Sequence, residues 1–86
     1  MRQIKWHSHA EQRLEERGID IKLAQAALRN PDVIIPKGKM KIIHKRYYDS
    51  QRNKEYLLRI FVEVHNGDWI VRSVYRTSKI VKYREG

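Results

Sequence analysis

An Asn-Gly dipeptide at residues 66–67 separates two apolar runs, YLLRIFVEV at 56–64 and WIVRSVY at 69–75. Asn-Gly between strand-like segments is the strongest short-range signal for a two-residue β-hairpin, because both turn residues must adopt positive φ. With these turn residues His65 faces Asp68, and each outward step pairs one residue from each strand on a shared face. The dipeptide therefore predicts which side chains of the two strands lie together.

This register divides the hairpin into two faces. The face expected to form the core collects Val64 with Trp69, Val62 with Val71, Ile60 with Ser73, and Leu58 with Tyr75. The opposite face collects Glu63 with Ile70, Phe61 with Arg72, Arg59 with Val74, and Leu57 with Arg76. Two helices can cover only one side of such a sheet, so we expect three arginines and an aromatic ring on the other side.

Two helices are predicted upstream of the hairpin. In SHAEQRLEERG, at residues 8–18, Ser8 and Glu11 have the spacing of a capping box, and Gly18 stands where a C-terminal glycine belongs. Asp20 is placed to cap a second helix, which ends before Pro31 because the residue before proline avoids the α region. The short link between them predicts a helical hairpin.

The remaining segments are predicted strands and loops. Residues 39–48 alternate imperfectly, 33–35 form a short β-branched stretch, and 2–6 can add a strand before the first helix. The expected order is β-α-α-β-β-β, with a short extra strand at 33–35 left open. We therefore predict an α+β fold in which a helical hairpin packs on one face of a small antiparallel sheet, with residues 1–86 as a single domain.

The charge of the chain points to an anionic partner. Nineteen Lys and Arg against ten Asp and Glu give a net charge of +9, which attracts polyanions and says nothing about fold. The segment 31–54 holds seven basic and two acidic residues and so contributes +5 of the total. Nucleic acid is the expected partner; a protein that is basic for solubility, or one that binds an acidic protein, is the alternative.

Other features limit the chemistry and the location. The chain has no cysteine, so no disulfide or thiolate zinc site supports it. His7 and His9 form an H-x-H pair without a third ligand at a defined spacing, and we expect no metal and no other cofactor. The N-terminal residues have no apolar signal core and no apolar run approaches the length of a membrane span, so a cytoplasmic protein without membrane contact is expected.

Three short stretches carry a family resemblance: HAEQRLEERGI at 9–19, ALRNPDVI at 27–34 and VYRTSK at 74–79. They resemble a widespread family of small prokaryotic domains of undetermined function, which looks related to the RelE- and BrnT-type toxins of toxin–antitoxin systems. The resemblance spans about residues 5–83. It implies a RelE-like fold, metal-independent cleavage of RNA, including RNA on the ribosome, and an acidic antitoxin as a further partner.

The resemblance marks positions, and the roles follow from chemistry. The marked positions are His9, Arg13, Arg17, Gly18, Tyr75, Arg76, Thr77, Ser78 and Lys79. Metal-free RNA cleavage uses the 2′-hydroxyl as nucleophile and needs a base, cations around the phosphorane and an acid for the leaving oxygen. We expect His9 to be the base, since the positive end of the helix dipole disfavours its protonation. Arg13, one turn further on, shares its helix face.

The rest of the expected site comes from the sheet. Arg76 and Lys79 are the expected catalytic cations, and the hypothesis is that His9 and these cations flank one phosphate at the end of the last strand. The expected nucleic-acid contacts are Arg17, Arg59, Phe61, Arg72, Thr77, Ser78 and Tyr83, with Tyr83 as an acid or a stacking surface. The sequence does not separate an endoribonuclease from a non-catalytic nucleic-acid-binding module, and an ordinary solvated sheet face is the simplest alternative.

Overall fold

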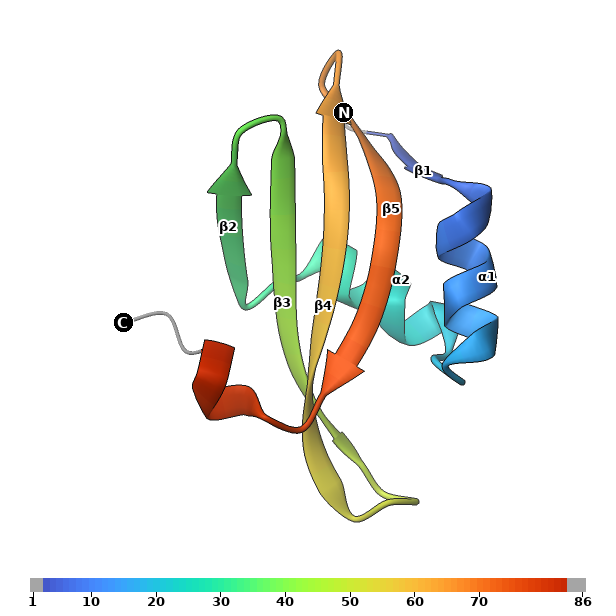
Figure 1. The fold of residues 1–86 in the computed structure, drawn as a ribbon, viewed down its shortest axis with the longest axis vertical. Coiled ribbons are helices and arrows are strands. Elements are labelled where there is room, and N and C mark those ends of the chain that lie inside the picture. The colour runs from blue at the N-terminus through green and yellow to red at the C-terminus, as the bar shows by residue number, and fades with distance from the viewer. Residues whose placement is uncertain (1–2, 84–86) are drawn as a thin grey trace.

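Two helices lie against a five-stranded sheet, and a short 3₁₀ helix follows the last strand (Figure 1). The computed structural model describes residues 3–83. Its strands are β1 (Ile4–Trp6), β2 (Val33–Lys37), β3 (Met40–Asp49), β4 (Lys54–His65) and β5 (Asp68–Thr77). Its helices are α1 (Ser8–Glu16), α2 (Ile21–Arg29) and the 3₁₀ helix η1 (Ile80–Tyr83). The α+β class is as predicted.

The sheet differs from the predicted one in two ways. Its strand order is β1-β5-β4-β3-β2, and β1 runs parallel to β5 while every other pair is antiparallel. The predicted antiparallel sheet and the order β-α-α-β-β-β are therefore wrong, because β2 is a full strand and β1 joins the far edge. Hairpin signals detect only neighbouring antiparallel strands, whereas a parallel pair needs a long crossover connection. Arg2, the first residue of the expected strand at 2–6, lies outside the described residues.

The helix ends follow the sequence signals with one change. Gly18 has φ +63, as a C-terminal glycine requires, and the Asp20 carboxylate accepts a hydrogen bond from Lys22 N at 2.9 Å. The N-cap of α1 is His7, not Ser8: its Nδ1 accepts a hydrogen bond from His9 N at 3.2 Å. His7 takes this place because its backbone is still extended and its N–H bonds to the sheet at Val71 O.

The core lies between the helical hairpin and one face of the sheet. Its buried residues are Ala10, Leu14, Ile19, Ala24, Ala27, Leu28, Ile43, Leu58, Ile60, Val62, Trp69, Val71 and Val74. We call the opposite sheet face, which α1 and α2 do not cover, the open face. In the part of the chain that is described, no helix is long and apolar enough to cross a membrane.

A β-bulge interrupts the β4–β5 hairpin. Asn66 and Gly67 have positive φ, and the predicted register holds from His65 opposite Asp68 to Val62 opposite Val71. Arg72 is then an extra residue without a cross-strand partner, so Phe61 faces Ser73 and Ile60 faces Val74. The physical reason is burial: the regular register places the Ser73 hydroxyl in the core opposite Ile60, whereas the bulge brings Val74 there instead.

The bulge reverses the predicted faces at the end of β5. Tyr75 faces Arg59 on the open face, and Arg76 faces Leu58 on the side of the helices. The prediction that Arg59, Arg72 and Arg76 share one sheet face is therefore wrong for Arg76. The prediction that Tyr75 points into the core is wrong for the same reason, because one extra residue moves every later side chain to the other face.

Deletion of Arg72 should leave the fold intact. The deletion removes the unpaired residue and keeps Ser73 opposite Phe61 and Val74 opposite Ile60, so we expect a loss of about 1–2 kcal/mol in the free energy of unfolding. Deletion of Val74 is the matched control, because it moves Tyr75 into the core and should leave no cooperative transition. Urea unfolding followed by circular dichroism measures both; equal stability of the two deletions contradicts this account of the bulge.

Candidate nucleic-acid interface

Arg59 lies at the centre of a side-chain cluster on the open face. Its Nε donates a hydrogen bond to His44 Nε2 at 3.1 Å, and its NH1 donates to the Tyr75 hydroxyl. The guanidinium carbon is 4.1 Å from the ring centre of Tyr83, 5.2 Å from that of Phe61 and 5.3 Å from that of Tyr75. We call these five residues the Arg59 cluster. Three strands and η1 contribute to it, so the whole face is needed to build it.

His44 orients the arginine. It faces Arg59 directly across the β3–β4 ladder and is 3% exposed. Its Nε2 is the acceptor of the hydrogen bond that Arg59 Nε donates, so His44 fixes the direction of the guanidinium. The Tyr83 ring meets the imidazole edge-on at 6.5 Å between ring centres. The cluster thus holds Arg59 through an imidazole nitrogen rather than through a carboxylate.

The charge of Arg59 is not neutralised by a carboxylate within residues 3–83. The two other arginines on this face do have such partners: Arg46 lies 2.8 Å from Glu55, and Arg72 lies 3.0 Å from Glu63. Every contact of Arg59 described above is to an imidazole, a hydroxyl or an aromatic ring. A partly buried cation held only by uncharged groups attracts an anion from solution.

The pKa values of the two tyrosine hydroxyls in the cluster are shifted in opposite directions. Burial, together with a hydrogen bond to Tyr83, raises the pKa of Tyr75. The same hydrogen bond lowers the pKa of Tyr83, with Lys82 and Arg59 adding positive charge nearby. Tyr75 therefore retains its proton more strongly, and Tyr83 releases its proton more readily, than an ordinary tyrosine.

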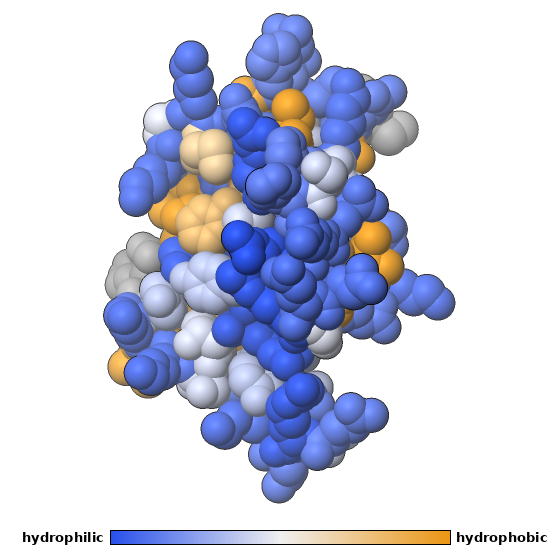
Figure 2. All heavy atoms as spheres, turned by 45° about the vertical axis from the view of Figure 1, so that its right-hand side comes forward, coloured by the Kyte–Doolittle hydropathy of each residue, from blue (hydrophilic) through white to orange (hydrophobic). Residues whose placement is uncertain are grey.

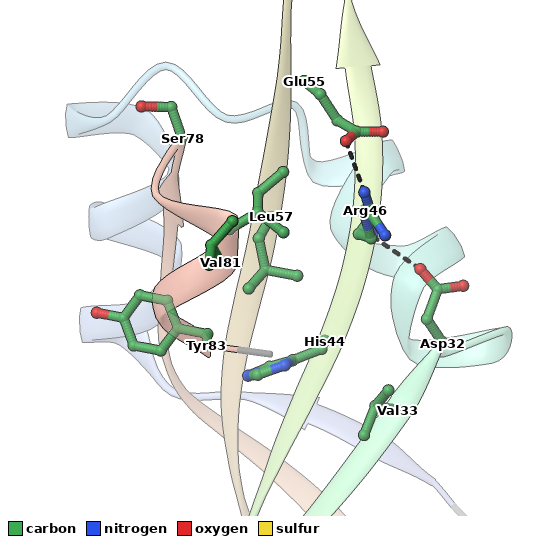
Figure 3. Close-up of a pocket in the computed structure, with 10 residues that line it drawn as sticks. Asp32, Val33, His44, Arg46, Glu55, Leu57, Ser78, Val81 and Tyr83 are labelled. Atoms are coloured by element: carbon green, nitrogen blue, oxygen red, sulfur yellow. Dashed lines mark hydrogen bonds and ion pairs between the residues drawn. The ribbon is translucent and has the colours of Figure 1, made fainter. Parts of the chain in front are cut away.

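A cavity of about 480 Å³ adjoins the cluster. It is lined by Asp32, Val33, His44, Arg46, Glu55, Leu57, Ser78, Ile80, Val81 and Tyr83. Figure 3 shows η1 on one side of this space, with the β3 and β4 side chains facing it and the Arg46 and Glu55 pair at one end. The Arg46 backbone N–H, which donates to Asp32, lowers the pKa of the Asp32 carboxyl. The walls are mostly apolar and the charged groups gather at one end.

The structure brings several predicted residues to this region. Arg59, Phe61 and Tyr83 belong to the cluster, and Ser78 lines the cavity. Thr77 faces Leu57 at the end of β5, and its hydroxyl oxygen accepts a hydrogen bond from the backbone N–H of Lys79 at 3.1 Å. Lys79 is exposed beyond the strand end.

The structure does not bring His9 and Arg76 together. His9 lies in the first turn of α1, with its ring 5.2 Å from that of His7. Arg76 NH1 donates to Gly18 O, at 3.4 Å, just past the other end of α1. Nine residues of helix span about 13 Å, so the hypothesis that His9 and Arg76 flank one phosphate does not hold. Arg13 lies between them and pairs with Glu16 at 3.3 Å.

Arg17 and Arg76 instead meet at the edge of β5. Arg17 NH1 donates to Val74 O at 2.5 Å, and its guanidinium carbon lies 5.9 Å from the centre of the Tyr75 ring. Arg17, Tyr75 and Arg76 line a second, open hollow. Figure 2, which turns the α1 side forward, shows hydrophilic side chains over most of this side, with only small apolar groups between them. This edge is a second cationic surface, separate from the Arg59 cluster except through Tyr75.

Sequence reasoning missed two members of the cluster, His44 and Tyr75. The turn at residues 50–53 carries no two-residue signal that fixes the β3–β4 register, so His44 was not placed opposite Arg59. Tyr75 was assigned to the core through the regular hairpin register. The available signal was Ser73, because a serine in a core position indicates that the alternation is broken. Among residues 3–83, no group of three or more His, Asp or Glu side chains is placed to hold a metal ion.

Replacing Tyr83 by Phe should lower the pKa of Tyr75. The substitution removes the Tyr83 hydroxyl, whose hydrogen bond contributes to the raised pKa of Tyr75, while burial of Tyr75 is retained. NMR titration of the ring carbons bonded to oxygen, with ¹³C-labelled tyrosine, follows each hydroxyl separately. Tyr48→Phe, on the same sheet but outside the cluster, is the control. An unchanged Tyr75 pKa in Tyr83→Phe contradicts the hydrogen bond between the two hydroxyls.

Most of the chain matches one family model. Residues 6–76 match the family model described as a domain of unknown function, DUF4258. No curated protein and no solved structure matches the chain. The matched range contains His44, Arg59, Phe61 and Tyr75 and stops before η1, which supplies Tyr83. The match covers most of the chain, which therefore belongs to the DUF4258 family.

Proposed function

We propose that the open face binds single-stranded RNA and cleaves it without a metal ion. In this proposal the protein is a cytoplasmic toxin of a toxin–antitoxin-like system, with a RelE-like fold and an acidic antitoxin as its protein partner. The observation that carries the proposal is Arg59, a cation that the fold holds in place and leaves without a carboxylate partner among the described residues.

The cluster suits an RNA phosphate and its neighbouring base. Arginine presents planar, paired donors that match two phosphate oxygens. Phe61, Tyr75 and Tyr83 provide ring faces and edges on which bases stack whatever their sequence. The net charge of +9 adds long-range attraction to the RNA backbone. Arg59 has no ion pair with another residue in the range 3–83, so an RNA phosphate bound to it breaks no charge contact within that range.

The proposed reaction is an in-line transfer within the RNA. The 2′-oxygen forms a bond to phosphorus, the bond from phosphorus to the 5′-oxygen breaks, and a 2′,3′-cyclic phosphate results. The ionised Tyr83 takes the proton of the 2′-hydroxyl, and Tyr75 gives its proton to the leaving 5′-oxygen, in keeping with the opposite directions of their pKa values. Arg59 stabilises the charge that develops on the phosphorane. His44 is a positioning residue that holds Arg59.

The same geometry also suits a module that binds RNA without cutting it. Arg59 and the rings are sufficient for binding, whereas cleavage depends on proton transfer by the two tyrosines. Binding and cleavage therefore need separate measurements on the same variants.

Arg59→Gln should weaken both binding and cleavage. One lost phosphate contact lowers the slope of log K against log salt by about 0.7 for single-stranded RNA. Loss of a donor to the transition state lowers the cleavage rate by about 10²–10³-fold. Arg29→Gln is the matched control, since it removes the same charge from an exposed position on α2, on the other side of the sheet. Binding is measured by fluorescence anisotropy at several salt concentrations, and cleavage by gel analysis in EDTA.

The outcomes separate the candidate functions. Salt-dependent binding without 2′,3′-cyclic phosphate products indicates the non-cleaving module. Equal binding and cleavage by Arg59→Gln and Arg29→Gln removes the open face as the site. Growth arrest on expression of the parent chain, relieved by Arg59→Gln but not by Arg29→Gln, supports the toxin role, and normal growth with the parent contradicts it.

The cleavage rate should rise with pH on the alkaline side of neutrality. Only the ionised Tyr83 accepts a proton, and its lowered pKa makes that form available at lower pH than for an ordinary tyrosine. At still higher pH the rate should fall as Tyr75, whose pKa is raised, loses the proton that it donates. Initial rates across the pH range measure this profile. A rising limb that survives in Tyr83→Phe shows that another group is the base.

A further inference from the structure

We propose that the cavity between η1 and the sheet binds one guanine base of the RNA. This assignment rests on the proposed function, because the base belongs to the nucleotide whose phosphate Arg59 holds. His44 and Tyr83 are part of the Arg59 cluster and also line the cavity. The phosphate position and the cavity therefore share two side chains and lie within one nucleotide of each other.

The cavity has the shape and surface of a site for a flat ring. Its volume of about 480 Å³ lies in the range of small-molecule sites. Val33 and Leu57 form apolar walls on the sheet, and Ile80 and Val81 line the cavity from η1. The rings of His44 and Tyr83 close one side. Burial of both ring faces between such walls is favourable for any base, so the walls contribute affinity but no preference among the bases.

The charged groups at one end of the cavity supply a preference among the four RNA bases. Carboxylates repel RNA phosphates because both are negatively charged, yet Asp32 and Glu55 both line this cavity. The Asp32 oxygens accept hydrogen bonds from Lys45 Nζ and Arg46 N, so Asp32 is engaged within the fold. Glu55 Oε1 accepts a hydrogen bond from Arg46 NH2 at 2.8 Å. The Arg46 and Glu55 side chains are 57% and 50% exposed, and in this proposal Glu55 Oε2 and the other Arg46 donors meet the edge of the base.

Guanine matches this arrangement of donors and acceptors best. An ionised carboxylate only accepts hydrogen bonds, and guanine alone among the four RNA bases presents two adjacent donors, N1–H and N2–H₂. Its O6 and N7 are acceptors that suit arginine. Adenine and cytosine offer one amino group each, and uracil places an acceptor on each side of its single N–H. The Glu55 and Arg46 pair thus complements the guanine edge and leaves polar groups unmatched with any other base.

Binding of the four nucleoside monophosphates tests the assignment directly. Titration of guanosine, adenosine, cytidine and uridine monophosphates, followed by tyrosine fluorescence or calorimetry, should give a dissociation constant for guanosine monophosphate about 10-fold or more below the others. Glu55→Gln should reduce this preference to within about threefold, because an amide presents a donor where a second acceptor is needed. Val33→Trp, at an exposed wall position, should fill the cavity and weaken binding of every base.

Glu63→Gln is the matched control. Glu63 lies on the same strand and the same face, also pairs with an arginine at 3.0 Å, and does not line the cavity. It should keep the guanine preference of the parent. Equal affinity of the parent for all four nucleotides overturns the assignment, as does an unchanged preference in Glu55→Gln. Binding and cleavage of RNA by the parent without base preference overturns only the cavity assignment. Guanine preference in a protein that neither binds nor cuts RNA overturns only the proposed function.

Discussion

The bulge at Arg72 is the constraint on which the site depends. Before it, β5 has strand partners on both sides, because β1 pairs with Trp69, Ile70 and Val71. After it, β5 pairs only with β4. The extra residue thus falls where the parallel partner ends and the strand is free to change its twist. It allows Val74 to complete the core and turns Tyr75 toward Arg59 in the same step, so core packing and site geometry are set together.

The Arg59 cluster keeps a positive charge in a partly buried place by surrounding it with groups that carry no negative charge. A carboxylate partner would stabilise the guanidinium more simply, as Glu55 and Glu63 do for Arg46 and Arg72, but it would also cancel the attraction for a phosphate. Two hydrogen bonds, to His44 and to the Tyr75 hydroxyl, and the quadrupoles of the three rings offset part of the desolvation cost. Under the proposed function, this arrangement gives up some stability and leaves the charge of Arg59 for an RNA phosphate.

The local parts of the fold could be predicted from sequence and the long-range parts could not. Gly18, Asp20 and the turn at 66–67 act through their own backbone geometry, so their roles are visible in the residues themselves. The face of Arg59 and Phe61 follows from that turn, because these residues are on β4, which keeps its alternation.

The wrong predictions concern features that depend on a neighbouring strand as well as on the residues themselves. Arg76 was placed wrongly because the bulge depends on whether Ser73 or Val74 fits opposite Ile60, which is a property of the core and not of β5 alone. The parallel β1–β5 pair joins segments that are more than sixty residues apart in the chain, with Ile4 opposite Trp69. No turn between them fixes that register. His44 was missed for the same reason, since the loop between β3 and β4 has no two-residue turn.

The family match divides the site into two parts. Residues 6–76 include the arginine, its histidine acceptor and Tyr75, so most of the Arg59 cluster lies within the matched domain. In the proposed chemistry the matched part holds the phosphate and contains Arg46 and Glu55, which select the base, whereas Tyr83 and one wall of the cavity come from η1, beyond the matched range. Under the proposed function, a chain with the same domain and a different continuation after β5 would retain the cation for RNA and would lose the proton acceptor and one wall of the base cavity.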